Sequence, residues 1–159
     1  MGIDIIDYLN YLGQERYRAV IIHTIPEKST ALTAFSLKLC EKASGKYLDL
    51  LDMFISDDNL NTQIDKFDPE EFRNLLIKES SSETLLVVDR VDFLLDTWRK
   101  MERKQFFRLM ENQWDSFKEN MKAKLIINMQ TTQEIGSIKI NDSQGESRIF
   151  KLSNFNEIL

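Results

Sequence analysis

The sequence predicts an α/β fold: a three-layer sandwich in which helices cover both faces of a mainly parallel five-stranded sheet. Two observations lead to this prediction. Short apolar runs typical of strands buried on both faces recur along the chain, and segments with helical spacing separate them. The length of 159 residues is about that of one domain, so we expect a single unit over 1–159.

The composition limits the kind of protein this can be. Apolar residues make up 42% and charged residues 30%, and the net charge is −5, which argues against a protein that coats nucleic acid through bulk charge. The single cysteine, Cys40, excludes an intramolecular disulfide or a cysteine-rich zinc site and favours a reducing, cytoplasmic location. We expect neither a secretory signal nor a membrane span, because no apolar stretch approaches the ~20 residues that a bilayer requires.

The first half of the chain predicts two helices and two strands. Apolar residues at helical spacing predict a helix over 3–15, namely Ile5, Ile6, Leu9 and Leu12. A short apolar run then predicts a buried strand over 18–23. Apolar residues at helical spacing predict a second helix, which begins near Ser29 and ends at Ser44–Gly45. The apolar stretch that follows predicts a strand over 46–51. The polar residues 56–69 predict a loop or a frayed helix.

The second half begins with a strong helix start at Asp68, a capping residue followed by proline and two acids, and this helix should end near Ser80. The run 85–89 predicts a strand over 84–89. One long amphipathic helix is expected over 98–121, with four residues that should be buried: Phe107, Met110, Trp114 and Phe117. Two last strands are expected over 124–128 and 147–152, with a turn at 141–145 between them.

The segment between the first strand and the following helix is the first candidate site. P-loop proteins carry G-x-x-x-x-G-K-[ST] at this place, and Lys28 and Ser29 stand where the phosphate-binding lysine and the magnesium-binding hydroxyl belong. Ile22 and Glu27 replace the two glycines, so we expect residues 24–28 to follow a wider path than a phosphate-wrapping loop. An ordinary capped helix start would explain the same residues, since Ser and Thr are good caps.

Two further polar residues end predicted strands. Asp89 follows four apolar residues, as in a Walker B strand whose acid holds Mg²⁺. In ATP-hydrolysing proteins an acidic residue usually follows, but here Arg90 follows and Asp92 is displaced by two positions. Asn128 ends the run 125–127 and should face the carboxyl edge of the sheet, where ligands bind in open α/β folds. The alternative for Asp89 is that it only ends a strand and caps the next segment.

In this order the segments resemble the core of a P-loop NTPase of the AAA+ type, over residues 16–155 and after an N-terminal helix over 1–15. The resemblance implies the sheet order 5-1-4-3-2, a sensor 1 role for Asn128, and no helical lid, because the chain stops at Leu159. It also implies a site for ATP and Mg²⁺. The nucleotide would contact Thr24, Glu27, Lys28, Ser29, Thr30 and Asn128, and the metal would contact Ser29 and Asp89.

In length and layout the sequence is similar to the small lidless P-loop protein of type 3 BREX phage-defence systems. Residues 91–95 match the apolar segment that follows the acid-ending strand in that family. Both Walker motifs depart from the family pattern, which implies weak nucleotide binding and weak or absent hydrolysis. We assign no catalytic residue.

Three functions remain open on the sequence. The first is a degenerate P-loop subunit of a multi-protein assembly in phage defence. The second is an active Mg²⁺-dependent ATPase whose site a neighbouring subunit completes. The third is a plain α/β adaptor with no link to nucleotides. Other protein subunits, or a second copy of this chain, are the expected partners.

The remaining polar residues carry weaker signals. His23, the only histidine, is interpreted as structural, and Cys40 as a small buried side chain. A basic cluster lies at the start of the predicted long helix, formed by Arg99, Lys100, Arg103, Lys104 and Arg108. This cluster could contact DNA phosphates or an acidic partner, or it could be a solvated helix face.

Overall fold

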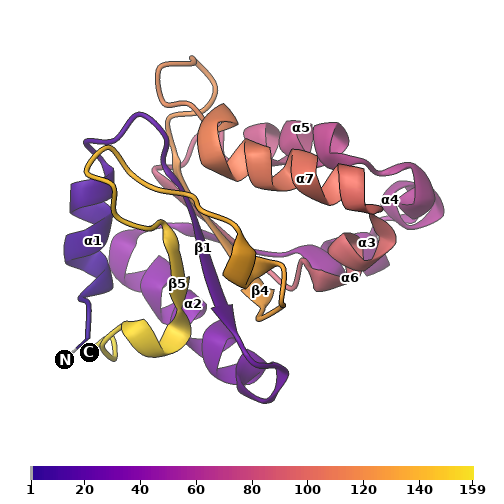
Figure 1. Ribbon diagram of the computed structural model, residues 1–159. Coiled ribbons are helices and arrows are strands. Elements are labelled where there is room, and N and C mark those ends of the chain that lie inside the picture. Colours follow the sequence, from indigo (N-terminus) through magenta and orange to yellow (C-terminus); the bar gives the residue numbers. More distant parts are fainter. Residues whose placement is uncertain (1) are drawn as a thin grey trace.

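Figure 1 shows the computed structural model, which describes residues 2–159. Its centre is a five-stranded sheet made of β1 (Ala19–Thr24), β2 (Lys46–Asp49), β3 (Leu85–Asp89), β4 (Lys124–Gln130) and β5 (Ile149–Lys151). All neighbouring strands are parallel, and they follow the order β2-β3-β4-β1-β5. Read from the β5 edge, this is 5-1-4-3-2. The acid-ending strand β3 therefore lies inside the sheet, between β2 and β4.

Helices lie on both faces of the sheet, and the alternation of side chains in β1 shows why. Val20 and Ile22 pack in one apolar cluster with α1 (Ile5–Leu12) and α2 (Ser29–Ala43). Ala19 and Ile21 pack in a second cluster on the opposite face. That face is covered by α3 (Leu50–Ser56), α5 (Pro69–Glu79), α6 (Asp92–Thr97) and α7 (Lys100–Arg108) (Figure 1). The sandwich thus has three layers.

Local capping accounts for several helix starts. The Asp68 carboxylate accepts the Glu71 N–H at 2.8 Å, and Pro69 occupies the first turn of α5, as the sequence predicts. Asp49 does the same for α3, where its carboxylate accepts the Asp52 N–H at 3.0 Å. This cap ends β2 at Asp49, two residues earlier than expected. The polar stretch that follows is not a plain loop, because it forms α4 (Asp58–Thr62) and a 3₁₀ turn over Ile64–Lys66.

The prediction of one long helix over 98–121 is wrong. Trp98 is extended, and its indole N–H donates to the Phe67 carbonyl at 2.7 Å, so the chain breaks between α6 and α7. After α7, residues Leu109–Gln113 form a π-helical turn. The backbone is irregular from Trp114 onward, where the Asp115 carboxylate pairs with the Arg16 guanidinium at 2.8 Å. This ion pair directs the chain back toward the segment before β1 rather than along a helix axis.

The end of the regular helix determines which side chains of residues 107–117 are buried. Phe107, Met110 and Trp114 are buried as predicted. The prediction for Phe117 is wrong, because 75% of this residue is exposed and its ring lies 4.7 Å from the Arg16 guanidinium carbon. A helix through residue 117 would have turned Phe117 toward the sheet, whereas the irregular chain leaves it outside. Within residues 2–159, no helix combines the length and the apolar character that crossing a membrane would require.

Candidate functional site

The segment between β1 and α2 is a compact turn. Pro26–Lys28 form one turn of 3₁₀-helix in which the Lys28 N–H donates to the Ile25 carbonyl at 2.9 Å. The Ser29 N–H donates to the Pro26 carbonyl in the same way. These N–H groups are therefore engaged inside the turn and cannot converge on a phosphate. The expectation of a path wider than a P-loop is wrong, because the connection is shorter and closes on itself.

The two positions that would hold glycines explain this geometry. Ile22 is not in a loop at all, since it lies in β1 with Asn128 of β4 and Phe150 of β5 as register partners. Extending the strand to Thr24 leaves only four residues before α2 begins at Ser29. Glu27 lies in the turn and is exposed, as are Lys28 and Thr30. Of the candidate nucleotide contacts, only Ser29 and Asn128 therefore reach a common cavity.

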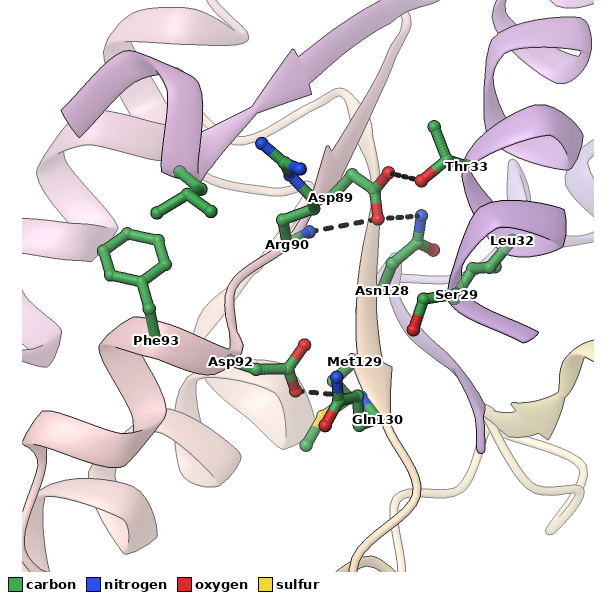
Figure 2. Close-up of a pocket in the computed structure, with 11 residues that line it drawn as sticks. Ser29, Leu32, Thr33, Asp89, Arg90, Asp92, Phe93, Asn128, Met129 and Gln130 are labelled. Carbon is green, nitrogen blue, oxygen red and sulfur yellow. Dashed lines mark hydrogen bonds between the residues drawn. The ribbon is translucent and has the colours of Figure 1, made fainter. Parts of the chain in front are cut away.

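This cavity lies at the carboxyl ends of β3 and β4, between α2 and α6, and has a volume of about 180 Å³ (Figure 2). It is bounded by Ser29, Leu32, Thr33, Leu51, Asp89, Arg90, Asp92, Phe93, Asn128, Met129 and Gln130. The location is the one that open parallel sheets use for ligands. The volume is below the roughly 300–1,000 Å³ typical of sites for small molecules and cofactors. The structure thus brings together Ser29, Asp89 and Asn128, but in a small space.

Asp89 is buried, with 4% of its surface exposed, and both of its oxygens are occupied. One oxygen accepts the hydroxyls of Thr33 and Tyr47, each at 2.6 Å. The other accepts the Asn128 amide at 3.3 Å and the backbone N–H of Arg90 at 3.0 Å. A carboxylate has about four acceptor positions, so these four hydrogen bonds leave none for a metal ion.

Tyr47 and Asn128, two of the donors to Asp89, are themselves held in place by burial and hydrogen bonds. Burial, and then the hydrogen bond to Asp89, raise the pKa of the Tyr47 phenol well above its usual value, so it stays a donor. Asn128 is 1% exposed and donates a second hydrogen bond to the Ser36 hydroxyl at 2.6 Å. Its Oδ1 is buried and has no partner within residues 2–159. The Asn128 amide therefore donates to both Ser36 and Asp89, with the shorter contact to Ser36.

Arg90 and Asp92, which follow the strand, also serve the architecture. Arg90 has a positive φ of 59°, which a residue with a side chain rarely adopts, and its guanidinium pairs with Asp49 at 3.1 Å. The Asp92 carboxylate accepts the Gln130 N–H at 2.9 Å and so ties α6 to β4 (Figure 2). Burial raises the pKa of Asp92. Arg90 is a cation and cannot act as the acid that would orient an attacking water, whereas the Asp92 carboxylate, which accepts the one hydrogen bond from Gln130, lines the cavity at Asp89.

The residues that the resemblance implies for Mg²⁺ and ATP do not fit that ligand. Protein donors already occupy the Asp89 carboxylate, which would have to hold the metal ion. The turn before α2 carries the Glu27 carboxylate, and its N–H groups at Lys28 and Ser29 donate within the turn and not toward a ligand. Within the described chain, no group of three or more His, Cys, Asp or Glu side chains is arranged to hold a metal ion. We therefore derive no chemical step through a nucleotide.

Three residues of the buried network were not singled out by sequence reasoning: Thr33, Ser36 and Tyr47. A signal was present for two of them, since Thr33 and Ser36 are small polar residues spaced i, i+3 on α2, beside the buried positions Leu32 and Leu39. Polar residues on a buried helix face require partners, and Asp89 and Asn128 supply them. For Tyr47 the sequence offered no comparable signal.

The structure also places the weaker candidates. His23 is buried, its Nδ1 lies 2.8 Å from the Thr131 hydroxyl, and burial together with Lys151 lowers its pKa. Cys40 is buried, which raises its pKa to about 11 and makes the thiolate rare at neutral pH. In the basic cluster, Arg103 is tied to the Trp98 carbonyl and to Glu134. The other four residues are exposed.

Comparisons with protein-family models, with curated proteins and with solved structures gave no match.

Proposed function

We propose that this protein is a degenerate P-loop-like module that does not hydrolyse ATP and works as a subunit of a multi-protein assembly. One observation carries the proposal: the carboxylate that would hold Mg²⁺, Asp89, is saturated by four donors of the protein itself. The parallel sheet with β3 inside it is compatible with a P-loop ancestry. The compact turn over Pro26–Lys28 is what remains of the phosphate-binding segment in this view.

The same geometry supports a role as a subunit. The cavity at the strand ends is small and its carboxylate Asp89 already binds four protein donors, so chemistry at this place is disfavoured. A chain that keeps such an architecture without the chemistry contributes through its surfaces. Phage defence is the setting that the likeness to the type 3 BREX protein suggests, with a cytoplasmic location and with partners encoded by neighbouring genes.

Isothermal titration calorimetry with ATP and Mg²⁺ tests the nucleotide part of the proposal. The unmodified protein should bind with a dissociation constant in the high micromolar range or weaker, and a phosphate-release assay should detect no turnover. Glu27→Gly is the matched variant, because it restores the second glycine position at an exposed residue. Glycine at Ile22 is unsuitable, since it would remove a buried strand side chain. Mg²⁺-dependent turnover by the unmodified protein would overturn the proposal and favour the active ATPase, whereas tighter binding by Glu27→Gly alone would support a P-loop ancestry.

The assembly part needs a separate experiment. The chain should co-purify with the product of at least one neighbouring gene when both are expressed together, and deletion of its gene should raise the plating efficiency of phage on the host. A chain that remains alone with every neighbouring product, and whose deletion leaves plating unchanged, would contradict a role in such an assembly.

A further inference from the structure

A second cavity lies away from the strand ends, between α5 and α7, which run side by side on the outer face of the molecule (Figure 1). Its volume is about 280 Å³, larger than that of the cavity at Asp89. Arg73 of α5 and Arg108 of α7 both line it, together with the amide side chains of Gln105 and Gln113. We call this space the α5–α7 cleft.

The two arginines of the cleft have no anionic partner in the protein. Among residues 2–159, neither guanidinium takes part in an ion pair. The Nε–H of Arg73 is buried and finds no hydrogen-bond acceptor within the described chain. An unsatisfied buried donor is costly. Because this Nε–H is enclosed, an anion in the cleft would meet the terminal N–H groups of Arg73, which have no hydrogen-bond partner within the described chain either. The net charge of −5 makes two unpaired arginines in one cleft a local feature rather than a result of bulk charge.

The backbone beside the cleft is unusual as well. Leu109–Gln113 form a π-helical turn closed by the Trp114 N–H, which donates to the Leu109 carbonyl at 3.0 Å. Turns of this kind are rare and occur frequently at functional sites. The buried Arg148 guanidinium holds the turn in place by donating to the carbonyls of Met110 and Glu111. Gln113, at the end of this turn, is thereby placed at the cleft.

We propose that the α5–α7 cleft binds a phosphate group. Two guanidiniums match the charge of a phosphate, and their planar N–H donors suit its oxygens better than a point charge does. The amides of Gln105 and Gln113 add neutral donors. Glu70 is the one acidic residue of the cleft, and because it is exposed it can turn to solvent. The proposal does not depend on the nucleotide question, because none of these residues belongs to the β1–α2 turn or to the network of Asp89.

The phosphate could belong to a small molecule or to a nucleic-acid backbone. Lys100 and Lys104 precede Arg108 at four-residue spacing on α7, and all three line a neighbouring cavity with Lys139. Two acidic residues, Glu111 and Glu134, line the same cavity, so its cations outnumber its carboxylates by four to two. A nucleic-acid strand would place successive phosphates along this row, whereas a small phosphate monoester would use the cleft alone. The chemistry recognised at Arg73 is the same in both cases.

Nuclear magnetic resonance on the full chain tests the proposal, with inorganic phosphate, phenyl phosphate and a short single-stranded oligodeoxynucleotide as probes. The Nε–H resonance of Arg73 should shift on addition of at least one probe. Arg73→Gln and Arg108→Gln should each weaken binding of that probe by about tenfold or more, as expected for loss of a charged hydrogen-bond donor. Lys38→Gln, an exposed cation on α2, should change it less than twofold.

Two measurements distinguish the sources of the phosphate: the salt dependence of binding, and the effect of Lys104→Gln on binding. If oligonucleotide binding depends strongly on salt, and Lys104→Gln makes this dependence weaker, the phosphate belongs to a nucleic-acid backbone. Tighter binding of phenyl phosphate, unaffected by Lys104→Gln, identifies a small phosphate ester. The proposal is overturned if no probe shifts the Arg73 resonance at millimolar concentration, or if both arginine variants bind as well as the unmodified protein while retaining its fold by circular dichroism.

Discussion

Two charged side chains are buried at opposite ends of β1 and its neighbours, and each is stabilised without a partner of opposite charge. Asp89 lies at the carboxyl edge of the sheet, and three of its four donors are side chains, from α2, β2 and β4. Arg148, only 1% exposed, lies at the amino-terminal end of β1. It donates to four backbone carbonyls, those of Ala19, Met110, Glu111 and Asn141.

The difference lies in which atoms supply the stabilisation. Side-chain donors can be removed one at a time by substitution, so the surroundings of Asp89 can change while the backbone stays in place. The partners of Arg148 are main-chain carbonyls, which no substitution removes. We therefore expect the carboxyl edge to tolerate stepwise change and the amino-terminal end to depend on one residue.

The largest effect is expected at Arg148. Arg148→Met keeps the length of the side chain but removes four charge-assisted hydrogen bonds to carbonyls, and should lower the free energy of unfolding by about 3–5 kcal/mol. Arg148→Lys, which keeps the charge with fewer donors, should cost less. Urea denaturation measures both. A loss below about 1 kcal/mol for the methionine variant would mean that water replaces the guanidinium and that the two regions do not differ.

Asp89→Asn should have the next largest effect, about 2–3 kcal/mol in the same measurement, because charge-assisted hydrogen bonds are lost and an amide N–H₂ faces groups that also donate. The sign of the change is informative. A neutral or stabilising substitution would indicate a carboxylate strained in its surroundings, as functional residues often are, and would argue against Asp89 as a structural centre.

Removal of a single donor to Asp89 should lower the free energy of unfolding by less than Asp89→Asn does. Tyr47→Phe and Thr33→Val should each lower the free energy of unfolding by about 0.5–1.5 kcal/mol, because one hydrogen bond is lost and three remain. Both hydroxyls bind the same oxygen, so the double variant should depart from the sum of the single effects. Strict additivity in the thermodynamic cycle would show that the two contacts are independent.

The smallest effect concerns pH at His23, which also lies at the carboxyl end of β1. Its pKa is lowered in the folded protein by burial and by Lys151, so the unfolded chain binds the proton more tightly. Stability should therefore decline as pH falls below about 6.5, by a small amount because only one group contributes. His23→Gln should reduce that decline in denaturation curves recorded at pH 7.5 and pH 5.5. An unchanged decline would assign it to other groups.

The candidate site could be predicted only in part. Asp89 and Asn128 were recognisable because a polar residue ending an apolar run lies at the edge of a parallel sheet, whatever the remaining fold. The state of Asp89 was not recognisable. Its donors Thr33, Tyr47 and Asn128 are spread over about a hundred positions of the chain, and only the packing of α2 against the sheet brings them together.

The sequence by itself determined the buried strands and three of the helices, α1, α2 and α5, because continuous apolar runs, helical spacing and the cap at Asp68 act over a few neighbouring positions. Tertiary structure decided where regular structure stops. Trp98 donates to the Phe67 carbonyl and Asp115 pairs with Arg16, and at both residues the backbone is not helical. The predicted long helix is therefore limited to α7 and a π-helical turn. The turn before α2 is compact for a similar reason, since β1 pairs with both neighbours as far as His23 and draws those residues into the sheet. Each of these outcomes depends on partners distant in sequence, which local patterns do not contain.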